Sequence, residues 1–194
     1  MKLNVPLNPG NVFLFSGHMI DAPDRKEPRF PAEKEGSAAK AINYQLDALG
    51  AGPGDLGLCG GACGGDLLFA EACLACGMAM EIRIPFAVPE FLEKSVAFAG
   101  SNWVERFYKV IESLKVRLLV MPEELGALPQ ESDPYERDNL WQLESALSFG
   151  PEKVRFLCLW NGKGGDGPGG TRHMVESVKQ RSGKVYILDT NTLW

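Results

Sequence analysis

Six short runs of apolar residues recur along the chain, and each is long enough for a buried β-strand. The runs are almost continuously apolar, whereas a strand with one face in water alternates between apolar and polar residues. Continuous apolar strands are typical of a parallel sheet that helices cover on both faces. The predicted strands are residues 12–15, 56–59, 80–85, 116–120, 154–160 and 185–188.

Helical periodicity fills the segments between these runs. Residues 38–49 place apolar side chains on one stripe, and Gly50 is suited to end that helix. A second helix is predicted over residues 67–76, with Asp66 as its N-cap and Gly77 just beyond its end. Further helices are predicted near Pro89, around the stripe Trp103, Phe107, Val110 and Leu114, and from Thr171 to just before Gly183.

The clearest helix start lies at residues 132–136. Asp133 is suited to cap the helix, Pro134 to occupy its first position, and Glu136 to complete a capping box. The side chains predicted to turn inward from this helix are Leu140, Leu143 and Leu147. Strands and helices alternate without a break in composition, which predicts one α/β domain over residues 1–194: Rossmann-like, doubly wound, with a mainly parallel sheet of about six strands.

The composition is that of an ordinary globular domain, with 194 residues of which 45% are hydrophobic and 23% charged. No apolar run is long enough to span a bilayer, and the first residues lack the apolar core of a signal peptide. We therefore expect a cytoplasmic protein with no membrane partner. The net charge of −5 disfavours nucleic acid as a partner, because domains that bind nucleic acid usually present a basic face.

Five cysteines in a chain without an export signal indicate reduced thiols. Four of them fall within residues 59–76, which raises a zinc site as one interpretation. The alternative is favoured, because Cys59 ends a predicted strand while Cys73 and Cys76 belong to an almost wholly apolar helix. A free thiol packs in such a core as a small hydrophobe. We therefore expect no metal and no cofactor.

Two glycine-rich segments follow predicted strands, at the edge where ligands bind in an open parallel sheet. The first is residues 60–66, which lead directly into a helix. Glycines let a backbone approach a ligand closely, and the amides of a helix start carry a partial positive charge that suits phosphate. The candidate ligand-binding residues of this segment are Gly61, Ala62, Gly64, Gly65 and Asp66. The alternative is that these glycines serve only tight packing between the strand and the helix.

The second segment is residues 160–171, and a helix follows it as well. Gly169, Gly170 and Thr171 are placed to offer backbone amides and a hydroxyl to an anion. Because the carboxyl ends of parallel strands meet at one edge of a sheet, both segments are expected to converge on the same ligand.

Two other segments add candidates. The first strand runs into a long loop with no predicted helix until about residue 37. The candidate ligand-binding residues at the start of that loop are Ser16, Gly17 and His18. Farther along, Arg137 is able to pair with a phosphate and Asn139 to read an edge of a base or ribose. The alternative for this segment is a capped helix with an ordinary surface ion pair.

Together these segments resemble the SLOG superfamily, a Rossmann-like group that includes the Smf/DprA proteins and the LOG phosphoribohydrolases. The matching residues, in order along the chain, are 15–18, 60–66 with Glu71 and Ala72, 84–86, 137–139 and 167–171. The resemblance implies a pocket for a nucleotide or a nucleotide-derived signalling ligand, with Phe86 among its residues. It also implies a role as a ligand-sensing module in bacterial signalling or defence.

The resemblance carries an alternative, the LOG-type removal of a base from a nucleoside monophosphate. LOG enzymes place a catalytic Glu three residues after a Thr, whereas here Met174 stands three residues after Thr171 and Glu176 stands five after it. If the chain is an N-glycosidic hydrolase, the catalytic candidates are Glu71 and Glu176. The departure favours binding without hydrolysis, with a nucleotide-like small molecule as the partner.

Two larger assemblies go with this interpretation. Rossmann-like domains commonly pair, so a homodimer is one expectation. The chain ends just past its last predicted strand, which leaves room for an effector domain in a longer protein.

Overall fold

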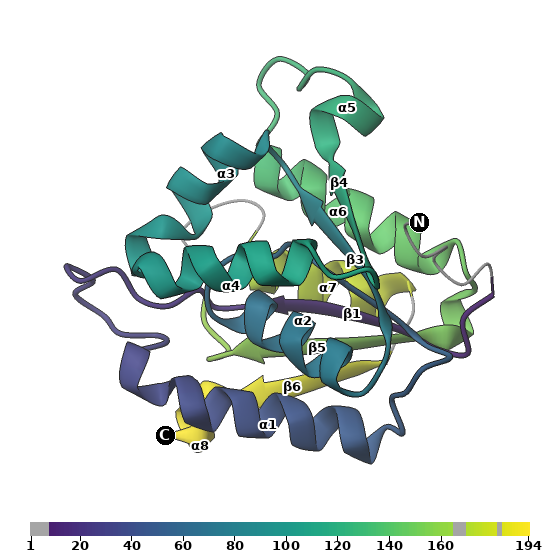
Figure 1. Ribbon diagram of the computed structural model, residues 1–194, viewed down its shortest axis with the longest axis horizontal. Helices are drawn as coiled ribbons and strands as arrows, with labels where there is room; N and C mark the ends of the chain where they lie inside the picture. Colours follow the sequence, from purple (N-terminus) through teal and green to yellow (C-terminus); the bar gives the residue numbers. More distant parts are fainter. Residues whose placement is uncertain (1–7, 165–169, 182–183) are drawn as a thin grey trace.

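A parallel sheet forms the centre of the computed structural model, which describes residues 8–164, 170–181 and 184–194 (Figure 1). In these residues the sheet has six strands in the order β4-β3-β2-β1-β5-β6, and every neighbouring pair is parallel. The strands are β1 Val12–Gly17, β2 Leu56–Cys59, β3 Ala79–Ile84, β4 Val116–Val120, β5 Val154–Trp160 and β6 Val185–Asp189. All of the strands expected from the apolar runs are present, and the Rossmann-like α/β fold class is confirmed.

Helices connect the strands and cover both faces of the sheet. They are α1 Glu35–Ala48, α2 Gly65–Ala75, α3 Val88–Ser95, α4 Ser101–Ile111, α5 Met121–Leu125, α6 Pro134–Leu147, α7 Thr171–Arg181 and α8 Thr190–Leu193. Short 3-10 turns occupy Ala32–Lys34, Ala97–Ala99 and Pro151–Lys153. In the described residues no helix combines the length and the apolar character needed to cross a membrane.

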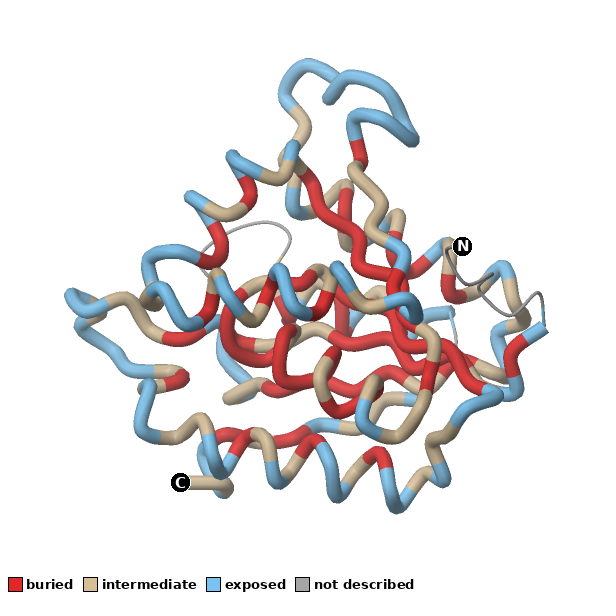
Figure 2. Tube along the Cα trace, viewed as in Figure 1, coloured by how far each residue is buried: buried red, intermediate tan, exposed pale blue. Residues whose placement is uncertain are grey.

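Strand β1 divides two hydrophobic cores. Phe13 and Phe15 pack in the larger core with α1, α2 and α4, whereas Val12 and Leu14 pack in the smaller one with α6 and α7. The alternation follows because successive residues of a strand face opposite sides of the sheet. Figure 1 shows α1, α2 and α4 in front of the sheet with α6 and α7 behind it, and Figure 2 shows the central strands buried between these layers.

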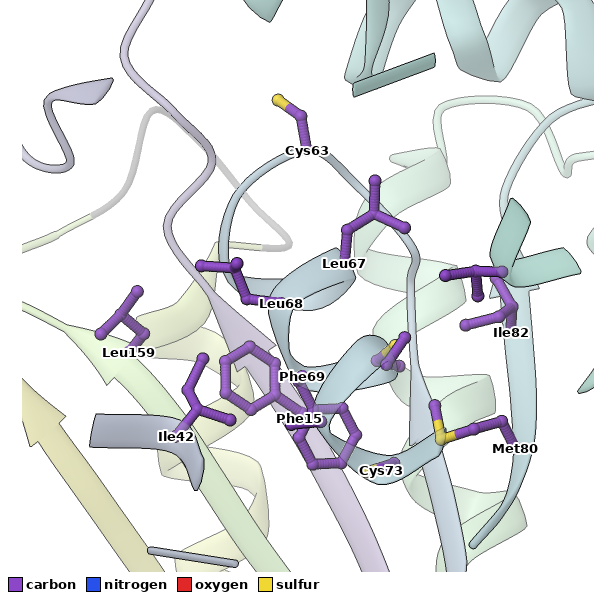
Figure 3. Close-up of a cluster of buried hydrophobic side chains, with 14 of the residues drawn as sticks. Phe15, Ile42, Cys63, Leu67, Leu68, Phe69, Cys73, Met80, Ile82 and Leu159 are labelled. Carbon is purple, nitrogen blue, oxygen red and sulfur yellow. The ribbon is translucent and has the colours of Figure 1, made fainter. Parts of the chain in front are cut away.

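The larger core is centred on a pair of aromatic rings (Figure 3). Phe69 of α2 stacks on Phe15 of β1, with 4.8 Å between the ring centroids and 13° between the ring planes. Neither side chain is exposed by more than 1%. Cys63 and Cys73 are buried in the same core, as expected for thiols that pack as small hydrophobes.

The structure corrects three details of the predicted helices. The N-cap of α2 is Gly64, at φ 89°, and Asp66 lies inside the first turn rather than at the cap. Leu114 lies beyond the end of α4 and is exposed. Leu140 of α6 faces outward, because the buried stripe of that helix runs through the polar residues Asp138 and Gln142 as well as Leu143 and Ala146.

Other helix signals are confirmed. The side chain of Asp133 accepts the backbone N–H of Glu136 at 2.8 Å, and Pro134 opens α6. Gly50 and Gly77 follow the ends of α1 and α2 with φ of 68° and 88°. The short helices α5 and α8 have no counterpart in the sequence pattern, because four or five residues are too few to show a helical period.

The order of the strands reverses beside β1. Strands β1 to β4 are added one after another in one direction, and the chain then returns to place β5 on the other side of β1. The connections from β1 and from β5 therefore leave toward opposite faces of the sheet, to α1 and α7. Such a reversal opens a crevice at the carboxyl ends of the two strands, where ligands bind in open α/β sheets.

We expect Phe69→Ala to lower the free energy of unfolding by about 3–5 kcal/mol, because it empties the centre of the larger core. Tyr44→Ala is the matched control, since this aromatic side chain on α1 is 75% exposed and its loss is expected to cost less than about 0.5 kcal/mol. Urea unfolding of both variants makes the comparison. Equal effects would show that the stacked pair is not the centre of the core.

Candidate functional site

A cavity of about 430 Å³ opens at the carboxyl edge of the sheet, at the reversal beside β1. Its walls come from the ends of β1 and β5, from the segments after β2 and β3, and from the starts of α2, α6 and α7. The volume lies within the range of small-molecule sites. Eight of the residues predicted from the sequence line it: Ser16, Gly17, His18, Ala62, Asp66, Asn139, Gly170 and Thr171.

One end of the cavity is formed by hydroxyls and the start of a helix. Thr171 is the first residue of α7, and its Oγ1 lies 3.4 Å from Oγ of Ser16 on β1. The carbonyl of Gly170 accepts the backbone N–H of His173, so the chain has already entered the helix at Gly170. The first amides of a helix have no partner within it and carry a partial positive charge. This end suits an anion. Gly169, which was also predicted here, lies outside the described residues.

The glycine segment before α2 is arranged differently, because most of its amides bind protein groups. The N–H of Gly65 donates to the carbonyl of His18 at 3.1 Å, and the N–H of Cys63 donates to the carbonyl of Ser95 at 2.9 Å. A Cβ on Gly64 would lie 2.7 Å from the backbone nitrogen of Ile20. Glycine is therefore required there for close packing, which is the alternative interpretation of this segment.

Gly61 is also a packing residue. A Cβ there would lie 2.7 Å from the side chain of Ile82, and its φ of 75° disfavours other residues. A Cβ on Gly65 would meet Phe15 at 3.1 Å. Neither glycine, nor Gly64, is among the residues that line the cavity. The expectation that the segment offers bare amides to a phosphate is thus corrected for these positions.

The anion that this glycine segment does hold is the carboxyl group of Asp66. Its Oδ2 accepts the N–H of Ala62 at 3.3 Å. Backbone N–H groups of Gly17, Gly60 and Gly61 also favour its charged form. Burial outweighs these hydrogen bonds and raises the pKa of Asp66 to about 7. The side chain is half-buried and lines the cavity.

A second carboxyl group, that of Asp138, also borders the cavity and was not singled out in the sequence. It is 4% exposed, and its Oδ2 accepts Nε2 of Gln142 at 2.8 Å. Its Oδ1 is buried with no hydrogen-bond partner among the described residues. Burial and the neighbouring charge of Asp66 raise the pKa of Asp138 well above its ordinary value. The sequence signal was present, since Asp138 and Gln142 stand four residues apart on the buried stripe of α6.

His18 borders the cavity as a neutral side chain. Its Nε2 accepts the backbone N–H of Asn161 at 3.2 Å, so the ring proton is on Nδ1. Burial, together with the charge of Arg29, lowers the pKa of His18 to about 4. The residue is 7% exposed, and its backbone also bonds to Leu159 and Gly65. His18 therefore joins the ends of β1 and β5.

Aromatic side chains supply apolar surface to the cavity. Phe91, Tyr135 and Trp160 line it from α3, α6 and β5. The hydroxyl of Tyr135 lies 3.4 Å from Oγ of Ser95. Phe86, a predicted ligand residue, does not line the cavity. Its ring makes an edge contact with the ring of Tyr135, with 5.5 Å between the ring centroids.

The two glutamates proposed as catalytic candidates lie outside the cavity. Both carboxylate oxygens of Glu71 accept hydrogen bonds from Arg106, at 2.7 and 2.6 Å, and Arg106 also pairs with Glu35. Glu176 pairs with Arg172 at 2.9 Å on the exposed side of α7. These contacts explain both glutamates as surface ion pairs, so neither is placed to act on a bound ligand.

Arg137 is likewise directed away from the cavity. Its guanidinium donates to the backbone carbonyls of Leu125, Gly126 and Ala127, at 2.9 to 3.2 Å. It therefore ties the segment after α5 to the start of α6. The expectation that Arg137 binds phosphate is corrected, since it binds carbonyl oxygens of the protein.

Comparisons with known proteins assign no family to the chain. No protein-family model matches the chain, and no curated protein sequence matches it. Among solved structures, the chain is similar to a Moco carrier protein from Chlamydomonas reinhardtii, at 13% sequence identity and a TM-score of 0.37. The alignment covers 93% of this chain and 88% of that one.

The buried His18 makes stability depend on pH. Because its pKa is lower in the folded protein than in the unfolded chain, its contribution is present above pH 6.5 and is lost as the pH falls toward 4. Relative to His18→Gln, we expect the wild type to lose roughly 2 kcal/mol of unfolding free energy between pH 7 and pH 5. Urea unfolding measures the difference.

The control is His173→Gln, which changes the other histidine and leaves the His18 contribution in place. Parallel pH curves for the wild type and His18→Gln would contradict the assignment of a neutral, buried His18.

Proposed function

We propose that the cavity binds a nucleotide or a nucleotide-derived ligand and holds its phosphate at the start of α7. The observation that carries the proposal is the pairing of Ser16 and Thr171 hydroxyls, 3.4 Å apart, with the first turn of α7. Hydroxyls and the open amides of a helix start are the donors that bind phosphate without a basic side chain. Such a site is compatible with a net charge of −5.

The remainder of the cavity fits the rest of such a ligand. Its volume of about 430 Å³ accommodates a small organic molecule, and Tyr135 and Trp160 offer aromatic surface to a heterocycle. Asn139 and the carboxyl groups of Asp66 and Asp138 offer polar contacts. A phosphate site, aromatic surface and polar groups within one cavity match the chemistry of a nucleotide.

The biological setting that we propose is a sensing module of the SLOG type. The motif order that resembles this superfamily, and the cavity at the carboxyl edge of the sheet, both support it. In this role the protein acts in the cytoplasm in bacterial signalling or defence, pairs as a homodimer, and passes ligand binding on to an effector domain.

A second candidate function is N-glycosidic hydrolysis of a nucleotide, and Asp66 is the observation that favours it. A pKa of about 7 suits a general base at neutral pH, and the carboxyl group lies within the cavity. In this candidate Asp66 replaces Glu71 and Glu176, which are held in ion pairs outside.

Binding and hydrolysis are separated by one experiment. The protein is incubated with nucleoside monophosphates, dinucleotides and cyclic nucleotides, and the mixture is analysed by thermal unfolding and chromatography. The expected result is a raised unfolding temperature with the ligand recovered intact. Release of a free base would contradict pure binding and establish the second candidate.

Thr171→Val tests the anion end of the cavity. The change keeps the shape of the side chain but removes the hydroxyl, and we expect affinity for inorganic phosphate to fall about tenfold. Thr192→Val, at an exposed position in α8, is the matched control and is expected to bind like the wild type. Isothermal titration measures both. Unchanged binding by Thr171→Val would show that phosphate does not sit at the start of α7.

A further inference from the structure

A pair of carboxyl groups belongs to the lining of the cavity. Asp66 comes from the first turn of α2 and Asp138 from α6, on the two faces of the sheet, and both line the same cavity. A Cβ on Gly60 would lie 2.9 Å from Oδ2 of Asp66 and 3.5 Å from Nε2 of Gln142, so the lack of a side chain at Gly60 leaves room beside these two groups.

The hydrogen bonds of the pair are asymmetric. In Asp66, Oδ2 accepts the backbone N–H of Ala62, and in Asp138, Oδ2 accepts the amide of Gln142. A carboxyl group whose one oxygen accepts hydrogen bonds carries its proton on the other. In Asp138 that other oxygen is Oδ1, which is buried without a partner among the described residues, whereas the carboxyl group of Asp66 also accepts backbone N–H groups of Gly17, Gly60 and Gly61. An unused buried polar atom is costly, and a ligand group is one way to satisfy it.

We propose that Asp66 and Asp138 determine the specificity of this cavity by hydrogen-bonding an uncharged polar group of the ligand and rejecting an anionic one. The inference rests on the proposed function, since it takes the phosphate at the α7 end as given. The ligand is then a molecule with one anionic group and, elsewhere, a neutral hydrogen-bond acceptor such as a carbonyl oxygen or a ring nitrogen.

Burial outweighs the positive charge that acts on Asp138. Arg83 of β3 acts on Asp138, but its guanidinium pairs with Glu81 at 2.6 Å and stacks on Trp141 with 4.4 Å to the ring centroid. The thiol of Cys59, at the end of β2, has its pKa raised by burial and by both carboxyl groups, so it adds no charge.

Burial raises the pKa of both carboxyl groups, to about 7 for Asp66 and well above the ordinary value for Asp138. A group whose pKa is raised holds its proton below that pKa and loses it above. At pH 6 the pair therefore donates hydrogen bonds, whereas at pH 8 the ionised Asp66 repels an anionic ligand.

The experiment uses AMP, GMP, CMP and UMP, with inorganic phosphate as the reference, in isothermal titrations at pH 6 and pH 8. At pH 6 we expect at least one of the four nucleotides to bind about tenfold more tightly than phosphate, because it adds contacts at the carboxyl end. The ratio of the affinity for the nucleotide to the affinity for inorganic phosphate is expected to fall at pH 8. Titration with inorganic phosphate serves as the reference, because it reports how ionisation of the phosphate group changes binding.

Two substitutions at one position separate hydrogen bonding from shape. Asp138→Asn keeps a donor and an acceptor, so it is expected to retain the preference for the nucleotide. Asp138→Leu has a similar shape without either group, and is expected to reduce the preference about tenfold while phosphate binding stays unchanged. Thermal unfolding of both variants confirms that each is folded.

The outcomes distinguish this inference from the function on which it rests. Weaker phosphate binding in Thr171→Val together with a reduced nucleotide preference in Asp138→Leu supports both. If phosphate binds but none of the nucleotides exceeds it, or if Asp138→Leu behaves as the wild type, the specificity inference is overturned and the phosphate site stands. If phosphate itself does not bind at the start of α7, the proposed function fails and this inference fails with it.

The pH at which each of the two carboxyl groups loses its proton, measured in the ligand-free protein, gives an independent check. In ¹³C NMR spectra of the carboxyl carbons, we expect the signals of Asp66 and Asp138 to shift only as the pH rises above 6. Titration of both signals near pH 4 would contradict the inference.

Discussion

The reversal of strand order beside β1 is the constraint on which the rest of the structure depends. Hydrogen-bonded pairing of β1 with β2 on one side and β5 on the other forces the two following segments to opposite faces of the sheet. The cavity opens between them, and its two ends are built from different helix starts. Whatever the protein binds, the strand order decides where it binds.

The two glycine-rich segments at this edge look alike in sequence and differ in physical role. Before α2, the carboxyl group of Asp66 already occupies the place where backbone amides converge, and Gly61 and Gly64 are needed for contact with Ile82 and Ile20. At α7, the helix start faces the hydroxyl of Ser16 instead of a carboxyl group. One segment thus directs its amides at a carboxyl group of its own, and the other is suited to an anion from outside.

Much of the fold was accessible from the sequence, because burial on both faces leaves a strong apolar signal in each strand. The cap at Asp133 and the glycine after α1 were predictable for the same reason, since they depend on local geometry alone. The candidate site was accessible only in part. Ser16 follows from its position at the end of β1, and Asp66 and Thr171 follow from the glycine-rich segments before α2 and α7. Asp138 is a polar residue on a buried helix stripe, which an apolar pattern does not detect.

The misplaced residues are all held by partners within the protein. Glu71 and Arg137 were selected because their side chains have the right chemistry, but each is held by a partner whose position only the tertiary structure fixes. Glu176 is instead held by Arg172, four residues earlier on the same helix. Arg106, for example, is brought to Glu71 by the packing of α4 on α2, which connects residues 35 positions apart. Sequence spacing contains no record of such pairs.

The most direct test of the account is a titration of ¹⁵N-labelled protein with inorganic phosphate, followed by NMR of the backbone amides. The account predicts saturable shifts that are largest at Thr171 and Arg172, in the first turn of α7, and small at Gly64 and Gly65. Shifts largest in the segment before α2, or no saturable shift at all, would contradict it.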